Sequence, residues 1–118
     1  MKLPRTEYIG HVAVFYIPSI KLDAIPKLKD ISARQILHDY FVKNFNAYTH
    51  EVSNIAGYWV NKDKNILVKD AHERYEVSFK GRKKVQKFVE FLSEICALIE
   101  EDSIYLTMGY KSWLVLPK

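Results

Sequence analysis

Hydrophobic and polar positions follow two different periods along this chain, and these periods separate predicted strands from predicted helices. The segment Glu7–Ile17 is almost continuously apolar, is rich in β-branched and aromatic residues, and is followed by Pro18. This pattern is typical of a strand at the centre of a sheet. A Ser32–Gln35 capping box then opens a stretch in which apolar residues recur at helical spacing up to Phe45. This stretch predicts a helix that ends near residue 46.

The second half of the chain repeats the alternation of strand and helix. Residues 57–60 predict a strand, residues 61–65 a hairpin loop, and residues 66–80 a long returning strand. The apolar residues of the returning strand change from even to odd positions, which predicts a β-bulge or a short break around Lys69–His72. After Gly81, one wide apolar stripe predicts a second helix. Residues 104–108 predict the last strand of the core, and residues 113–116 predict an extra strand at the C-terminal edge.

The predicted order of elements, β-α-β-β-α-β, is that of the ferredoxin-like split βαβ unit. We therefore expect an α+β fold with a four-stranded antiparallel sheet, two helices on one face, and room for the extra C-terminal edge strand. No linker, repeat or low-complexity segment divides residues 1–118. The chain is accordingly expected to form a single domain.

Composition narrows the class of protein. Hydrophobic residues make up 48% of the chain and charged residues 27%, a balance that excludes intrinsic disorder. The lone cysteine, Cys96, has no partner for an internal disulfide, which indicates a reducing compartment. The apolar runs are too short to cross a bilayer, and the N-terminus has no signal-peptide core. We therefore expect a cytoplasmic protein that does not contact membranes.

The face of the sheet that two helices leave open is where we expect function. Strand parity places alternate residues on that face. The first strand allows two assignments, and we favour the one that turns its Val-rich set toward the core. The second strand offers either Tyr58 or Trp59. The expected partner-binding residues of the open face are His11, Phe15, Trp59, Arg74, Glu76, Tyr105 and Thr107.

Three functions compete for this face. Its mixed aromatic, arginine and polar composition favours an interface with another protein. Its rings favour base stacking with nucleic acid, but the third strand lacks the Lys/Arg-Gly-aromatic-x-aromatic run of RNA readers and has Glu76 at its centre. His11 and Glu76, on neighbouring strands, would form the acid–base pair of a small hydrolase or nuclease.

Positive charges are concentrated at the start of the second predicted helix, where five of them occupy eight residues without an acid. The residues expected to bind an anion or a nucleic-acid backbone there are Lys80, Arg82, Lys83, Lys84 and Lys87. An ordinary solvated surface is the alternative. The net charge of the chain is only +4, so the placement of the charges is more informative than their total.

The sequence carries no metal-ligand spacing and no phosphate-binding glycine loop, so we expect neither a metal nor a cofactor. Cys96 falls on the apolar stripe of the second helix, where a buried, unreactive thiol is expected. We interpret the chain as a small non-enzymatic binding protein of the inhibitor, immunity or anti-defence type, encoded by a phage or mobile element. It would act through a protein–protein interface. A homodimer through the open face or the C-terminal edge strand is compatible with this interpretation.

Overall fold

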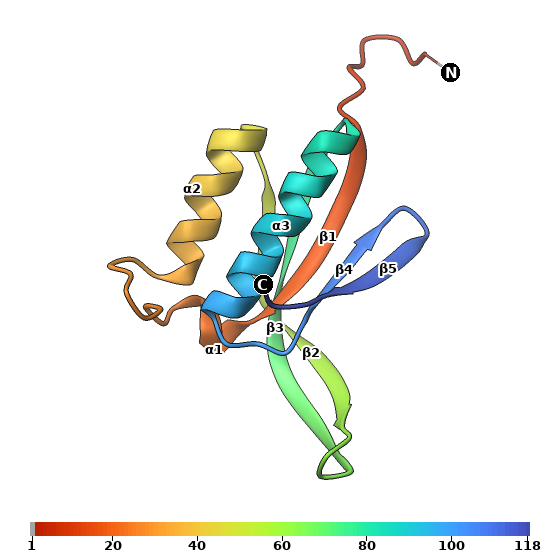
Figure 1. The fold of residues 1–118 in the computed structure, drawn as a ribbon. Coiled ribbons are helices and arrows are strands. Elements are labelled where there is room, and N and C mark those ends of the chain that lie inside the picture. The colour runs from red at the N-terminus through yellow and green to blue at the C-terminus, as the bar shows by residue number, and fades with distance from the viewer. Residues whose placement is uncertain (1) are drawn as a thin grey trace.

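The centre of the molecule is an antiparallel sheet of five strands in the order β2-β3-β1-β4-β5, shown in Figure 1. The computed structural model describes residues 2–118, apart from the side chains of residues 53 and 54. The elements along the chain are β1 (His11–Pro18), α1 (Ser19–Leu22), α2 (Ala33–Phe45), β2 (Thr49–Asn61), β3 (Ile66–Phe79), α3 (Arg82–Leu98), β4 (Ile104–Met108) and β5 (Lys111–Val115).

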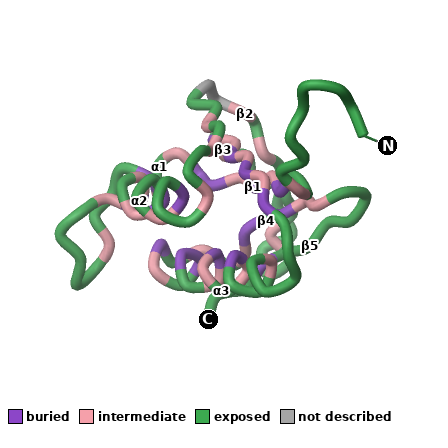
Figure 2. Tube along the Cα trace, turned by 90° about the horizontal axis from the view of Figure 1, so that it is seen from above, coloured by how far each residue is buried: buried purple, intermediate pink, exposed green. Residues whose placement is uncertain are grey.

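Helices α2 and α3 lie on the same face of the sheet, as the view from above in Figure 2 shows. Alternate residues of the central strands point into the layer between sheet and helices and are buried there: Ala13, Phe15, Ile17, Tyr75, Val77, Phe79, Ile104 and Leu106. The helices contribute Leu37, Phe41, Phe88 and Leu92 to the same core. Burial of these large side chains is the main driving force for folding.

The ends of α2 follow the sequence signals. The Ser32 hydroxyl accepts a hydrogen bond from the backbone N–H of Gln35 at 3.2 Å, which is the expected N-cap. Asn46 ends the helix in the left-handed conformation with φ 65°, a position that asparagine tolerates well. The short loop that follows leads directly into β2, so α2 packs against β3 and the start of β2.

The prediction of a mixed α+β fold with an antiparallel sheet is confirmed, but the sheet is larger than the predicted four strands. A third helix, the single turn α1, lies in the connection between β1 and α2. The predicted bulge between Lys69 and His72 is wrong. Strand β3 is continuous, and the register shift falls opposite it on β2, between Glu51 and Ile55.

The β2–β3 hairpin extends beyond the helices as a two-stranded arm (Figure 1) and makes the molecule elongated, with principal extents of 53 × 33 × 27 Å. This arm explains the change of parity in β3. Ile66 and Leu67 lie beyond the reach of α2 and α3 and are exposed. The apolar pattern there does not mark the core side of the sheet. Within the part of the chain that the structure describes, no helix is long and apolar enough to span a membrane.

Candidate functional site

The open face of the sheet carries the side chains that alternate with the core residues. The register aligns Tyr16 with Arg74, and Val14 with both Glu76 and Thr107. Because directly paired residues share a face, these five side chains form one surface opposite the helices. Arg74, Glu76, Tyr105 and Thr107 therefore lie on the face where they were predicted.

Two predicted open-face residues lie on the other side of the sheet. His11 and Phe15 share their parity with Ala13 and Ile17, and the register pairs them with Phe79 and Tyr75 of the core face. Phe15 is completely buried, with its ring stacked on that of Tyr75 at 5.1 Å. The assignment of parity to the first strand was wrong because both of its residue sets are apolar. The Val-rich set, which includes Val12, faces the open side.

This reversal also separates His11 from Glu76. The two side chains project from opposite faces of the sheet, so they form no acid–base pair. The hypothesis of a hydrolase or nuclease built on these residues is wrong.

An aromatic hollow of about 480 Å³ lies on the open face, where the hairpin arm leaves the body of the sheet. Its lining residues are Tyr16, Ile55, Ala56, Gly57, Tyr58, Trp59, His72, Ser103, Tyr105 and Leu114. The rings of Tyr16 and Tyr105 approach to 6.0 Å, and Trp59 meets His72 edge to face at 6.4 Å. Aromatic walls with few polar groups suit a flat ligand such as a heterocyclic base.

The position of His72 in this hollow depends on a glycine. A Cβ atom built on Gly57 would lie 2.5 Å from Nδ1 of His72, so only glycine leaves the ring room against β2. Nδ1 of His72 lies 3.2 Å from the carbonyl oxygen of Asp70. Because a carbonyl only accepts, this contact is a hydrogen bond in the tautomer that carries the proton on Nδ1, and in that neutral tautomer Nε2 is an acceptor.

An ion pair between Arg74 and Glu76 lies beside the hollow, because Arg74 of β3 is the cross-strand partner of Tyr16, which belongs to the aromatic wall. Arg74 donates to Glu76 at 2.8 Å, and both side chains are partly exposed. The hydrogen bond that Arg74 donates to the carboxylate of Glu76 raises the pKa of Arg74, and the hydroxyl of Tyr16 makes a smaller contribution in the same direction. The open face therefore presents a cation, an anion and several rings within one small area.

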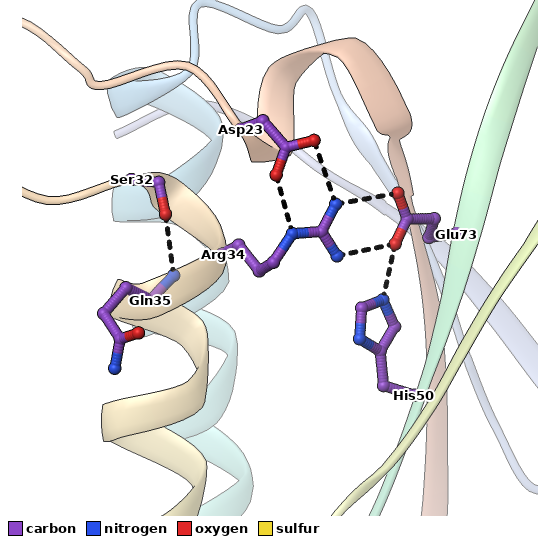
Figure 3. A network of polar contacts seen from close by, with 6 residues as sticks. All are labelled: Asp23, Ser32, Arg34, Gln35, His50 and Glu73. Carbon is purple, nitrogen blue, oxygen red and sulfur yellow. Dashed lines mark hydrogen bonds and ion pairs between the residues drawn. The ribbon is translucent and has the colours of Figure 1, made fainter.

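A second polar network lies on the helix side of the sheet and is drawn in Figure 3. The Arg34 guanidinium donates to both oxygens of Glu73, at 2.7 and 3.0 Å, and to both oxygens of Asp23, at 2.8 and 3.3 Å. Nε2 of His50 lies 2.8 Å from Oε1 of Glu73. Glu73 is only 4% exposed. The guanidinium of Arg34 lowers the pKa of Glu73, against the opposing effect of burial.

This network joins four elements, since α1, α2, β2 and β3 each place a residue in or next to it. Its carboxylate is fully engaged by Arg34 and His50, which leaves Glu73 little capacity to bind a substrate. We assign it a structural role. This network was not predicted from the sequence. Glu73 precedes the alternating apolar residues of β3, and nothing in the local sequence indicates that its carboxylate is buried and paired with Arg34.

A further groove of about 410 Å³ lies on the helix side, between α3 and the β4–β5 hairpin. Its walls are apolar and include Val85, Val89, Trp113 and Leu116, with Ser93 as the polar residue. The hydroxyl of Ser93 already donates to the carbonyl oxygen of Leu116 at 2.7 Å. With no charged group in its lining, this groove is a poorer site for a polar ligand than the aromatic hollow.

The other residues considered in the sequence are the cations of α3, the lone cysteine and the possible metal ligands. The cations predicted at the start of α3, Lys80 to Lys87, are exposed. Cys96 is buried, as predicted, and burial raises the pKa of its thiol to about 11. Among the residues described, no group of three or more His, Cys, Asp or Glu side chains is arranged to hold a metal ion.

No protein-family model and no curated protein sequence matches the chain. Two solved structures match its fold. A phage SAM lyase in complex with S-methyl-5'-thioadenosine has a TM-score of 0.62 and 8% identity, covering 98% of this chain and 96% of that chain. A phage SAM lyase in the apo state has a TM-score of 0.60 and 11% identity, covering 100% of this chain and 98% of that chain.

At such low identity the likeness shows the fold alone, which extends over nearly the whole length of both chains, and both neighbours with this fold are enzymes. The prediction of a non-enzymatic binding protein of the inhibitor or immunity type is therefore wrong. That prediction depended on the absence of a recognisable catalytic motif in the sequence. The phage source of both neighbours fits the predicted phage origin.

Proposed function

We propose that the chain is an enzyme that binds S-adenosylmethionine on the open face of its sheet and cleaves it to S-methyl-5'-thioadenosine. One observation carries the proposal. An aromatic hollow lies directly beside the Arg74–Glu76 pair, on the fold of a SAM lyase. S-methyl-5'-thioadenosine, the ligand of that neighbour, is what S-adenosylmethionine becomes when its sulfur loses the aminocarboxypropyl group.

The side chains of the open face are chemically complementary to the three parts of this substrate: the adenine, the sulfonium and the amino-acid end. Adenine is flat and carries a 6-amino donor, which suits the rings of Tyr16 and Tyr105 and the Nε2 acceptor of His72. The sulfonium is a cation, which aromatic faces attract. The amino-acid end carries a carboxylate and an ammonium, which are complementary to Arg74 and Glu76 respectively.

The reaction needs no second reactant. A carboxylate oxygen of the substrate attacks its own γ carbon and forms the new C–O bond of a five-membered lactone. The bond from the γ carbon to sulfur breaks, and its electron pair stays on sulfur, which becomes a neutral thioether. No proton is transferred, and the positive charge on sulfur and the negative charge on the carboxylate both disappear.

The contribution of the protein to this step is position and environment. Arg74 would hold one carboxylate oxygen and leave the other directed at the γ carbon, which favours the cyclised conformation. Opposite charges attract more strongly where water is excluded, so the aromatic walls would promote the approach of carboxylate and sulfonium. Glu76 would anchor the ammonium group.

Incubation of the purified protein with S-adenosylmethionine, followed by chromatography for S-methyl-5'-thioadenosine, tests the proposal. Glu76→Gln should lower the initial rate by about tenfold or more, since a hydrogen bond to a charged group contributes roughly 1.5–3 kcal/mol. Tyr105→Ala should do the same by removing a wall of the hollow. Glu90→Gln and Tyr110→Ala, both exposed and outside the hollow, are the matched controls. Absence of product from the wild-type protein would refute the proposal.

We also propose that the sheet is an extended form of the ferredoxin-like arrangement. Strands β2, β3, β1 and β4 lie in the order expected for that unit, with the first and third strands in the middle, and β5 continues the sheet at its edge. This arrangement keeps both long helices on one side and leaves the open face to the substrate.

A further inference from the structure

We propose that the cationic end of the molecule binds the phosphate backbone of double-stranded nucleic acid, at a surface separate from the proposed substrate site. The cationic end is defined by the exposed side chains Lys43, Lys80, Arg82, Lys83, Lys84 and Lys87. The aromatic hollow lies elsewhere, at the root of the β2–β3 arm.

The fold gathers these cations from three elements. Phe45, at the end of α2, stacks on Phe79 at the end of β3, with ring centroids 4.9 Å apart, and also contacts Phe88 in α3. The end of α2, the end of β3 and the start of α3 therefore meet at one end of the molecule, at the top of Figure 1. Lys43 is thereby brought to the same end as the five cations near the start of α3.

These charges are not neutralised by acidic side chains within the described part of the chain, although Nζ of Lys80 lies over the ring of Tyr8 at 5.7 Å. None of the six cations forms an ion pair with any residue the structure describes. The first turn of α3 has no acidic residue, and its N-cap, Gly81, offers no side-chain acceptor. The helix dipole adds positive potential at this end, so the arrangement is unfavourable for the isolated chain and favourable toward an anion.

Acidic residues are gathered at the opposite end of α3, at Glu100, Glu101 and Asp102. Lys21 reaches that end and donates to the carbonyl oxygen of Ile99 at 2.9 Å, which stabilises the helix terminus. The charge of the molecule is thus polarised along α3. A polyanion approaching the protein would be steered toward the cationic end.

The distribution of the cations favours a polymeric phosphate over a single anion. Lys80 precedes α3, and from Arg82 to Lys87 the cations extend over about one and a half turns of the helix, roughly 8 Å, whereas duplex DNA carries one charge per roughly 1.7 Å of its axis. Residues 80–87 contain no aromatic side chain, and the neighbouring ring of Tyr8 is already engaged by Nζ of Lys80, at 5.7 Å from the ring centroid. Contacts from such a surface go to phosphates and carry no sequence preference.

Fluorescence anisotropy with a labelled duplex of about 20 base pairs tests the proposal as a function of salt concentration. If five phosphates are neutralised, the affinity should fall about 500-fold between roughly 50 and 200 mM salt. In the triple variant Arg82→Ala, Lys83→Ala, Lys84→Ala, two contacts remain, and the fall should be only about 12-fold. The triple variant should also bind more weakly than the wild type at the lowest salt concentration.

A matched control removes three positive charges from a different cluster, the hairpin arm, through Lys62→Ala, Lys64→Ala and Lys69→Ala. Its salt dependence should equal that of the wild type, because these lysines belong to the β2–β3 hairpin, which extends away from the start of α3 in Figure 1. Equal weakening in the two triple variants would show that only total charge matters and would overturn the proposal. So would absence of binding by the wild type at about 50 mM salt. Cleavage of S-adenosylmethionine by the Arg82/Lys83/Lys84 variant should be unchanged, so this proposal and the proposed function can fail separately.

Discussion

Replacing Arg34 with methionine tests how much of the stability depends on the buried network. Met fills most of the same space as the stem of Arg34 but donates no hydrogen bond. In the variant, the carboxylate of Glu73, whose side chain is only 5% exposed, loses both guanidinium bonds and keeps only the contact with His50. Asp23, which is well exposed, can be hydrated by water instead.

The expected loss of folding stability in Arg34→Met follows from the burial of Glu73. Removing one partner of a buried ion pair typically destabilises a protein by about 3–5 kcal/mol, because the remaining charge is left uncompensated. For a domain of this size such a loss corresponds to a decrease in Tm of roughly 10–20 °C. Asp23→Asn, the matched control at the exposed end of the same guanidinium, should have a much smaller effect.

The pH dependence identifies the cause. The pKa of Glu73 is lowered in the folded protein, so the network adds stability above the usual pKa of a glutamate and this stability is lost as the pH falls through the folded-state value. In Arg34→Met the carboxyl is protonated more easily. Urea unfolding of both proteins between about pH 7 and pH 4 should therefore show the deficit of the variant becoming smaller as the pH falls. A deficit below about 1 kcal/mol at pH 7, or one that grows on acidification, would refute the reasoning.

Three further predictions concern other parts of the molecule. Gly57→Ala should displace the ring of His72 and weaken the binding of S-methyl-5'-thioadenosine in calorimetry, and unchanged affinity would exclude His72 from the hollow's binding surface. The thiol of Cys96 should resist alkylation at about pH 8 until denaturant is added, since its pKa is raised to about 11. Rapid labelling of the native protein would contradict its burial. Phe41→Ala should cost about 3–5 kcal/mol in urea unfolding, because this ring of α2 is fully buried against α3 and the sheet. A loss below about 1 kcal/mol would show that the core is loosely packed there.

Elements with one strong local signal could be predicted from the sequence. The capping box at Ser32 and the apolar stripe of α3 each mark a helix, and the structure places both helices close to the expected residues. Strand β1 was also located, but its orientation was not. Because both faces of β1 carry apolar residues, periodicity alone did not show that Phe15 faces the core and Tyr16 the open side.

The candidate site was predictable only in part, because it depends on contacts between distant segments. Parity placed Arg74, Glu76 and Tyr105 on the open face, and these residues lie there. The hollow, however, needs the β2–β3 arm to bring Gly57 and His72 against the start of β4. The register shift on β2 that sets this geometry is not visible in the hydrophobic pattern. The buried ion pair of Glu73 with Arg34 joins residues 39 positions apart, so no local pattern indicates it.

The two tryptophans of the chain provide the most direct measurement of where a ligand binds. Trp59 lines the aromatic hollow on the open face, and Trp113 lines the apolar groove on the helix side. In a titration of ¹⁵N-labelled protein with S-methyl-5'-thioadenosine, the indole N–H signal of Trp59 should shift in a saturable manner while that of Trp113 stays in place. A shift of Trp113 alone, or of neither signal at saturating ligand, would contradict the assignment of the substrate to the open face.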